Sequence, residues 1–257
     1  MAPRLARITI FPIKSLDGVD LSSAQLTARA GLAHDRRFAM RDAEGKFVNG
    51  KRTSAIHPLA AQFDPTIETV TLGRRGAGEG TSFHLTRDRA TLERWLSDFF
   101  ALPVMLDENP TAGFPDDLDA PGPTLISTAT LETVAAWFPG MTVDDARRRF
   151  RTNLEIDGVE PFWEDRLYAM AGNPVRFGLG RAVIAGTNPC QRCVVPTRSP
   201  TDGDIWSGFQ KTFAQRRQAT LPAWAEPSRF NHYYRLAVNT QVIEAPAPIC
   251  VGDPLTL

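Results

Sequence analysis

The stretch Leu5-Ala-Arg-Ile-Thr-Ile-Phe11, directly before Pro12, sets the pattern of the fold. Its apolar side chains recur with a period of two, which predicts a half-buried β-strand. Pro12 ends the strand, because proline has no backbone N–H to donate to a neighbouring strand. Similar runs follow, separated by glycine-containing turns, at Arg37–Arg41, Thr66–Leu72 and Ser82–Thr86. We therefore expect the start of the chain to form a small antiparallel barrel or sandwich.

A helix is predicted after these strands. Asp88 is suited to cap its first turn. Its apolar face, at helical spacing, consists of Leu92, Trp95, Leu96, Phe99 and Phe100. The segment Asp107–Pro123, rich in Asp, Pro and Gly, separates this helix from the next apolar run. A domain boundary is expected there, with residues 1–110 in a first domain and residues 111–257 in a second.

The second domain is also predicted to be rich in strands. A helix is expected to begin at Ser127 or Thr128 and to end at Pro139-Gly140, and a short basic helix follows with Thr142 and Asp145 as its capping pair. The remaining predicted elements are strands at Asn153–Ile156, Val175–Phe177, Ala182–Ala185, Tyr233–Asn239 and Asp253–Leu257, and a helical segment at Phe209–Gln218. The predicted fold is mainly β with flanking helices (α+β), in two β-barrel-like domains.

The composition limits the partners of the protein. The 257 residues are 42% hydrophobic, and 29 basic residues balance 29 acidic ones. No overall field favours a nucleic acid polymer or an anionic membrane, so an anion must be recognised by a local cluster. No apolar run approaches the roughly 20 residues that span a bilayer. Met1–Arg7 lacks the apolar segment of a secretory signal, and three cysteines are too few for a disulfide framework, so we expect a cytoplasmic protein.

Two cysteines lie close together in the run Asn188-Pro-Cys-Gln-Arg-Cys193-Val-Val-Pro-Thr197. Arg192 puts a positive charge beside them, which favours the thiolate that binds soft metals. A zinc site would need four ligands, but the other cysteine and the four histidines have no ligand spacing. A thioredoxin-like site would need a helix start after the pair, which Pro196 disfavours. The spacing alone leaves metal ligation and two structural thiols equally open.

A set of motifs lies in order along nearly the whole chain: Pro12-Ile-Lys14-Ser15, Asp35-Arg36-Arg37-Phe38, Arg149-Phe-Arg151-Thr-Asn153, Arg192-Cys193 and Val251-Gly252-Asp253. This set resembles the MOSC family (molybdenum cofactor sulfurase C-terminal domain) in its long form, which carries an N-terminal β-barrel domain. Relatives include the mitochondrial amidoxime-reducing component and bacterial proteins that reduce N-hydroxylated bases. An ordered set of motifs is more specific than the cysteine pair alone.

The resemblance implies a molybdenum-molybdopterin cofactor (Moco), with Cys193 as the molybdenum ligand and the catalytic residue. Cys190 is then a supporting neighbour. The cofactor-binding residues that it implies are Lys14, Ser15, Arg36, Ser127, Thr128, Arg151, Asn153, Gln191 and Arg192. The cofactor's phosphate favours guanidinium groups, an ammonium group and the N–H groups of a helix start, and this set offers all three. The cofactor is expected in the cleft between the two domains.

Several of these residues also have a purely structural interpretation. Lys14 and Ser15 alone would be turn residues, and Asp35 with Arg36 would form a structural ion pair. The run Arg147–Arg149 is expected to be a solvated helix face.

The segment Glu160–Asp165 offers two acids, Glu164 and Asp165, for proton delivery, although an exposed loop acid is the default expectation. Trp163 and Trp206 would line a substrate slot or belong to the core.

The implied activity is a molybdenum-dependent reduction of amidoximes, hydroxylamines or hydroxylated bases to the amine. The chain lacks the four-cysteine run of an iron–sulfur domain, so electrons are expected from a separate ferredoxin, flavodoxin or cytochrome-type reductase. Two alternatives remain open. One is a non-catalytic carrier of molybdenum cofactor, and the other is sulfur transfer through a persulfide on Cys193 or Cys190.

Overall fold

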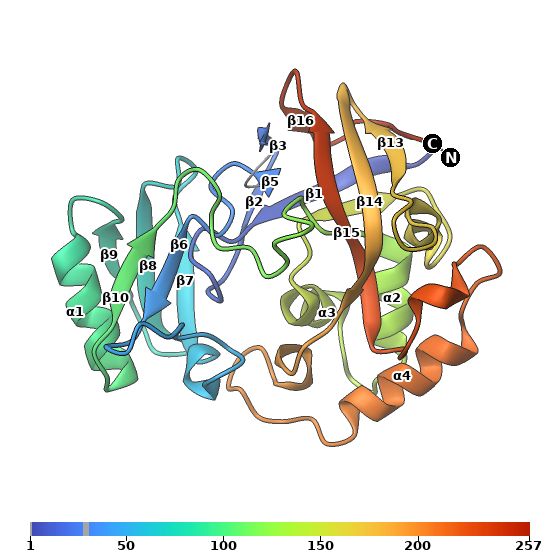
Figure 1. Cartoon of the computed structure of the whole chain (residues 1–257). Coiled ribbons are helices and arrows are strands. Elements are labelled where there is room, and N and C mark those ends of the chain that lie inside the picture. Colours follow the sequence, from blue (N-terminus) through green and yellow to red (C-terminus); the bar gives the residue numbers. More distant parts are fainter. Residues whose placement is uncertain (1, 28–30) are drawn as a thin grey trace.

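The computed structural model describes residues 2–27 and 31–257. Figure 1 shows two lobes side by side. The small lobe, residues 38–108, contains α1 (Arg89–Phe100), and the large lobe contains the long strands β14 (Ala182–Gln191) and β15 (Arg235–Glu244). Both chain ends lie on the large lobe. The predicted fold class, mainly β with flanking helices, is confirmed.

An eight-stranded sheet forms the large lobe. In spatial order its strands are β17 (Leu255–Thr256), β13 (Val175–Leu179), β14, β15, β11 (Leu125–Ser127), β12 (Leu154–Asp157), β1 (Arg4–Ile10) and β2 (Val19–Leu21). Neighbours are antiparallel except β11 and β12, which are parallel. Parallel neighbours need a crossover connection, and α2 (Thr128–Ala136) and α3 (Val143–Phe150) supply it.

Strand β1 contains most of the stretch that opens the sequence. Leu5, Ile8 and Ile10 are fully buried, and the last two follow the predicted alternation. The pairing with β12 shifts register between Leu5 and Arg7, so that Ile8 takes the buried position that strict alternation would give to Arg7. Such a β-bulge adds one residue to a strand without ending it. The strand therefore tolerates one break in its period.

The pairing of β1 crosses the expected domain boundary. Both of its neighbours, β12 and β2, belong to the sheet of the large lobe, and β3 (Ser23–Ala24) pairs with β16 (Ile249–Cys250) near the other end of the chain. The first strands therefore lie in the large lobe, across the expected division between residues 110 and 111. A two-residue period identifies a strand, but it carries no information about which strand pairs with it.

The small lobe is built around its own apolar core. Leu92 and Leu96 on α1 are fully buried in it, together with Phe38 and Leu72. Asp88 occupies the capping position of α1, but its carboxylate accepts from the His84 N–H (2.8 Å) instead of capping the helix. The strands of this lobe are β6 (Phe38–Arg41) paired with β10 (Met105–Glu108), and the sheet of β7 (Leu59–Phe63), β8 (Thr69–Arg74) and β9 (Thr81–His84).

Helix starts in the large lobe follow the predicted capping pattern. The Ser127 hydroxyl accepts from the Thr130 N–H (3.1 Å) at the start of α2, and Thr142 and Asp145 form a capping box on α3.

The remaining elements are α4 (Phe209–Ala219), β4 (Leu26–Thr27), β5 (Gly31–Leu32) and the 3-10 turns η1 (Ser54–Ile56), η2 (Trp163–Leu167), η3 (Val195–Thr197) and η4 (Pro227–Arg229). Within the described ranges, no helix has both the length and the apolar character needed to cross a bilayer.

Candidate functional site

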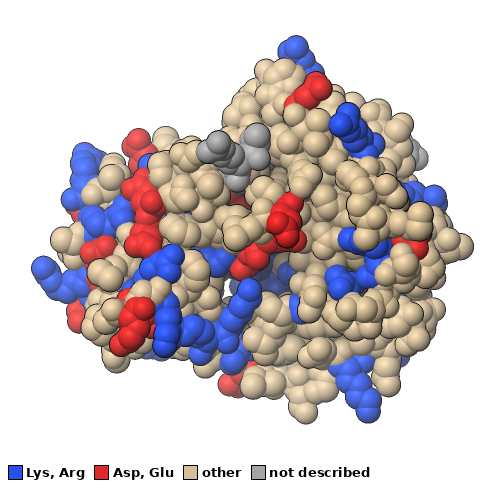
Figure 2. All heavy atoms as spheres, viewed as in Figure 1, with Lys and Arg blue, Asp and Glu red and all other residues tan. Residues whose placement is uncertain are grey.

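A cleft of about 1060 Å³ lies between the two lobes. Its walls come from the connection between β1 and β2, residues 49–51, residues 112–124, the end of α3 and the segment that follows β14. Figure 2 shows lysine and arginine atoms gathered around the hollow where the lobes meet. The volume is at the upper end of the range for ligand sites, which suits a cofactor together with a substrate.

The structure brings most of the sequence-predicted site residues into this cleft. Those that line it are Lys14, Ser15, Arg36, Arg151, Asn153, Gln191, Arg192 and Cys193. They come from both halves of the chain, and Cys190 lies among them. The cleft is therefore the candidate functional site.

Three of these residues have a left-handed backbone. The φ angles are 74° at Ser15, 49° at Arg36 and 51° at Arg151. Residues other than glycine rarely adopt this backbone conformation, which costs on the order of 1 kcal/mol or more per residue. Such strain is typical of functional sites. At Arg151 it ends α3 and turns the chain into the cleft, while the Arg151 N–H donates to the Arg147 carbonyl (2.8 Å).

The cleft lysines and arginines from the first half of the chain are each paired with an acid. Lys14 donates to the Phe114 carbonyl and to Asp116, both at 2.8 Å. Burial lowers the pKa of the Lys14 ammonium group. Burial opposes ionisation of Asp116, but Lys14 and Arg36 outweigh it and hold the pKa of this carboxyl well below its usual range. The other pairs are Arg36 with Asp35, Lys51 with Asp116 and Arg75 with Asp17.

The cleft arginines from the second half of the chain have no such partners. Of the described cleft residues, eleven are lysine or arginine and four are aspartate. Seven of the eleven form no ion pair with any described carboxylate: Arg148, Arg149, Arg151, Arg192, Arg198, Arg229 and Arg235. One wall of the cleft is therefore strongly positive, and an anion is its natural ligand.

Arg151 and Asn153 take different positions in the site. The Arg151 guanidinium lies 4.1 Å from the centre of the Phe11 ring. Burial and the nearby Arg36 lower its pKa to about 10, so it stays charged at neutral pH. The Asn153 amide is used within the protein, because it donates to the Thr9 carbonyl (3.1 Å) and accepts from the Thr124 N–H and hydroxyl (3.2 Å each). Arg151 is available to a ligand, whereas Asn153 holds the cleft wall in place.

The two cysteines of the cleft differ in their contacts. Cys190 Sγ accepts from Arg192 Nη1 at 3.1 Å, and the same guanidinium also donates to the Phe150 carbonyl. Cys193 is half-buried, lies just after β14 and faces the cleft without a hydrogen bond to the described residues. The Arg192 guanidinium, which the sequence places beside both cysteines, therefore contacts Cys190. The Cys193 thiol remains available to a ligand.

The cleft also contains residues that the sequence did not assign to it, among them Arg149, Arg198 and His57. The expectation that Arg147–Arg149 is a solvated face is wrong for Arg149, which is 6% exposed and donates to the Pro196 carbonyl (2.9 Å). Only Arg148 is exposed, and Arg147 pairs with Glu155 (2.7 Å). Arg149 follows buried Ala146 by three residues, and that spacing would have placed it on the inner face of α3.

The predicted helix-start residues do not line the cleft. Ser127 is fully buried, and its hydroxyl serves the first turn of α2. Thr128 donates to Glu155 (2.8 Å) and opens on a separate shallow depression beside Arg147. The chain enters the cleft earlier, at Thr124. The backbone N–H groups of α2 are therefore not part of the cleft, which corrects the assignment of Ser127 and Thr128.

Glu164 and Asp165 are buried outside the cleft. Glu164 is 1% exposed, and one of its oxygens accepts from the Thr130 hydroxyl (3.0 Å). Asp165 pairs with the equally buried Arg217. The expectation of exposed loop acids is wrong, because η2 packs these side chains into the lobe.

Trp163 and Trp206 both pack against the core and do not line the cleft, so their structural interpretation is favoured.

The buried Glu164 predicts a pH-dependent stability. Burial, and then the neighbouring Asp165, raise the pKa of its carboxyl to about 7 from 4.5. Below pH 4.5 the carboxyl is protonated in the folded and unfolded chain, so it costs nothing. As the pH rises towards 7, only the unfolded chain releases the proton, which costs the folded state about 3 kcal/mol above pH 7. Urea unfolding of Glu164→Gln at pH 5 and pH 8 is expected to lack this loss.

A matched control for this test is Glu160→Gln, because Glu160 is an exposed acid of the same segment. Its unfolding free energy should follow that of the unchanged protein at both pH values. Equal pH dependence in Glu164→Gln and the unchanged protein would contradict the assignment.

The described residues contain no group of three or more His, Cys, Asp and Glu side chains placed to hold a metal ion. A metal bound beside Cys193 would therefore take its other ligands from a cofactor or from solvent. A dithiolene cofactor, which brings two sulfur ligands of its own, suits a site with a single available thiol.

The comparisons with known proteins match the two-part architecture. A family model described as the MOSC N-terminal beta barrel domain matches residues 2–98, and one described as the MOSC domain matches residues 124–256. No curated protein matches significantly. A solved structure described as "Crystal structure of an hypothetical protein" is 21% identical over 58% of this chain and 55% of that chain, with a TM-score of 0.33. The match thus spans about half of that structure.

Proposed function

The chain belongs to the MOSC family, whose domain generally binds molybdenum cofactor, and from this premise we propose that the cleft binds that cofactor and reduces N-hydroxylated compounds. The observation that carries the proposal is the cleft itself. It combines an available thiol, Cys193, with arginines that lack a carboxylate partner, among them Arg151 and Arg192. A phosphorylated, thiol-ligated cofactor is complementary to both features.

Buried nitrogen atoms without partners test whether the residues suit such a cofactor. The Nε–H groups of Arg192 and Arg235 are buried and donate to no described residue. A buried N–H group without an acceptor is costly, and a bound anion removes that cost. The donors therefore fit a phosphorylated ligand.

The residues that would hold the cofactor come from both halves of the chain. Lys14, Ser15, Arg36 and Arg151 would contact its phosphate and pterin. Cys193 would ligate molybdenum, with Gln191 and Arg192 beside it. When bound, the cofactor would supply the two-electron redox chemistry.

The proposed reaction is the reduction of an N–OH group to N–H. For an amidoxime, two electrons and two protons break the N–O bond and give an amidine and one water. The protein's part is to bind and orient the substrate in the cleft and to exclude competing reactions. Electrons come from a separate redox protein, because the chain has only three cysteines, which is too few for an iron–sulfur cluster of its own.

Two other functions use the same cleft. A carrier would hold molybdenum cofactor without turnover, and a sulfur transferase would carry a persulfide on Cys193 or Cys190. The hydrogen bond from Arg192 to Cys190 Sγ does not distinguish between these two functions.

The test is to purify the chain from a molybdenum-replete host, to measure bound molybdenum and pterin, and to assay benzamidoxime with an artificial electron donor. We expect stoichiometric cofactor and benzamidine as product. Bound cofactor without turnover under several donors would establish the carrier. Absence of metal and pterin, with a persulfide on either cysteine, would overturn the proposal.

A further inference from the structure

Arg149 is held rigidly in the cleft wall without a counter-charge. It is 6% exposed, and its Nη1 donates to the carbonyls of Pro196 (2.9 Å) and Arg198 (2.5 Å). Its guanidinium lies 5.4 Å from the Trp206 ring centre, while its Nε has no partner. A buried guanidinium that is fixed by carbonyls and an aromatic ring is preorganised to receive an anion.

The two carboxylates that act electrostatically on Arg149 are hydrogen-bonded elsewhere. Asp145 forms the capping box of α3 with Thr142. Asp202 accepts from the Asp204 N–H (2.9 Å) in its own loop. Both influence Arg149 through space, but neither forms an ion pair with it. The positive charge of Arg149 is therefore uncompensated.

Two further donors surround this position. Arg198 lines the cleft, and its buried Nε has no partner. His57 reaches the cleft from the small lobe, is 8% exposed and has an unpartnered Nε2. Burial, followed by the charges of Arg198, Arg151, Arg75 and Arg149, lowers the pKa of His57 to about 4, so it is neutral at physiological pH. A neutral imidazole adds a hydrogen-bond donor without adding another positive charge.

Arg198 and Arg149 are both linked to the segment that carries the proposed metal ligand, and His57 lines the same cleft. The tight turn η3 links Cys193 to Arg198, through hydrogen bonds from the Thr197 N–H to the Val194 carbonyl and from the Arg198 N–H to the Val195 carbonyl (3.0 Å each). Arg149 also binds this turn, because its guanidinium donates to the backbone carbonyls of Pro196 and Arg198. The expected cofactor contacts, by contrast, fall on Lys14, Ser15, Arg36 and Arg151. Arg149, Arg198 and His57 are left for the substrate.

We infer that Arg149, Arg198 and His57 form a subsite for an oxyanionic group, a carboxylate or a phosphate, carried by the N-hydroxylated substrate. The inference rests on the proposed function and narrows its substrate class. Charged substrates are then held by charge-assisted hydrogen bonds, whereas neutral substrates leave the subsite unpaired.

The experiment compares three ligands that share one reacting group: benzamidoxime, 4-carboxybenzamidoxime and 4-(phosphonooxy)benzamidoxime. Each is titrated calorimetrically into the cofactor-loaded full chain. We expect at least one charged ligand to bind about tenfold or more tightly than benzamidoxime. The more tightly bound of the two identifies the oxyanion. Arg198→Gln should reduce the preference to about twofold or less, with unchanged benzamidoxime affinity and molybdenum content.

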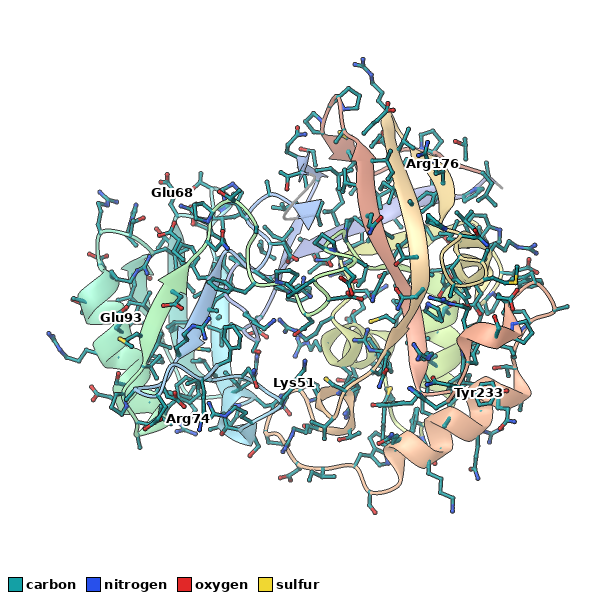
Figure 3. All side chains as sticks on the ribbon, in the orientation of Figure 1. Lys51, Glu68, Arg74, Glu93, Arg176 and Tyr233 are labelled. Atoms are coloured by element: carbon teal, nitrogen blue, oxygen red, sulfur yellow. The ribbon has the colours of Figure 1, made fainter. Side chains whose placement is uncertain are left out.

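Two variants make the result specific. Arg149→Lys keeps a positive charge but loses the fixed fork of the guanidinium, so it should weaken binding of the charged ligand alone. Arg176→Gln removes an exposed arginine of β13, far from the cleft in Figure 3, and should change nothing.

Equal affinity for charged and neutral amidoximes would overturn the inference while leaving the proposed function intact. Loss of molybdenum and pterin from Arg198→Gln would also overturn it, because the cluster would then hold the cofactor. Failure of the unchanged, loaded chain to bind or reduce any of the three amidoximes would instead contradict the proposed function.

Discussion

Cys193→Ala is expected to abolish amidoxime reduction, with a loss of about a thousandfold or more, while Cys190→Ala loses about ten- to a hundredfold. Both thiols line the cleft, but their roles in the account differ. Cys193 would be the protein's ligand to molybdenum. Cys190 accepts from Arg192 and so orients a neighbouring cation. Steady-state assays with benzamidoxime and an artificial donor measure both effects.

The control for this pair is Cys250→Ala, because Cys250 is exposed on β16 and lies outside the cleft. It should keep full activity, and all three variants should retain the circular dichroism spectrum of the unchanged protein. Equal loss in Cys193→Ala and Cys190→Ala would point to a paired-thiol mechanism and contradict the account.

Arg151→Gln is expected to lower cofactor affinity about ten- to a hundredfold, which is the loss of one charge-assisted contact with a phosphate. The variant should fold normally. Its guanidinium forms no hydrogen bond with the described residues, and the Phe11 ring below it stays packed. Molybdenum and pterin content, measured in protein expressed under limiting molybdate, reports the change.

Arg176→Gln is the matched control, since it removes the same charge from an exposed position on β13. Its cofactor content should equal that of the unchanged protein. Full cofactor content in Arg151→Gln under the same limiting supply would remove Arg151 from the binding site.

The local structure could be predicted from the sequence where a repeating pattern decides it. The apolar face of α1 and the capping pair Thr142 and Asp145 specify helices through contacts within one or two turns. The partners of β1 could not be predicted in this way. Its pairing with β12 joins residues far apart in the chain, and no local pattern encodes that choice.

The residues of the candidate site show the same difference between local patterns and long-range packing. Motifs that lie directly in the cleft, such as those of Lys14, Arg36 and Arg151, were found because their residues occur together in the sequence. His57 and Arg198 belong to no motif, and only the packing of the two lobes brings them to one cleft. Ser127 was misplaced for a related reason. A capping residue marks the start of a helix, but it does not say which surface that start faces.

The central claim is that Cys193 ligates molybdenum in this cleft. X-ray absorption spectroscopy at the molybdenum K-edge tests it most directly, on the purified protein and on Cys193→Ala loaded with cofactor. The account predicts a sulfur shell made of the dithiolene pair plus the Cys193 sulfur in the unchanged protein, and the dithiolene pair alone in Cys193→Ala. The same sulfur shell in both proteins would contradict it.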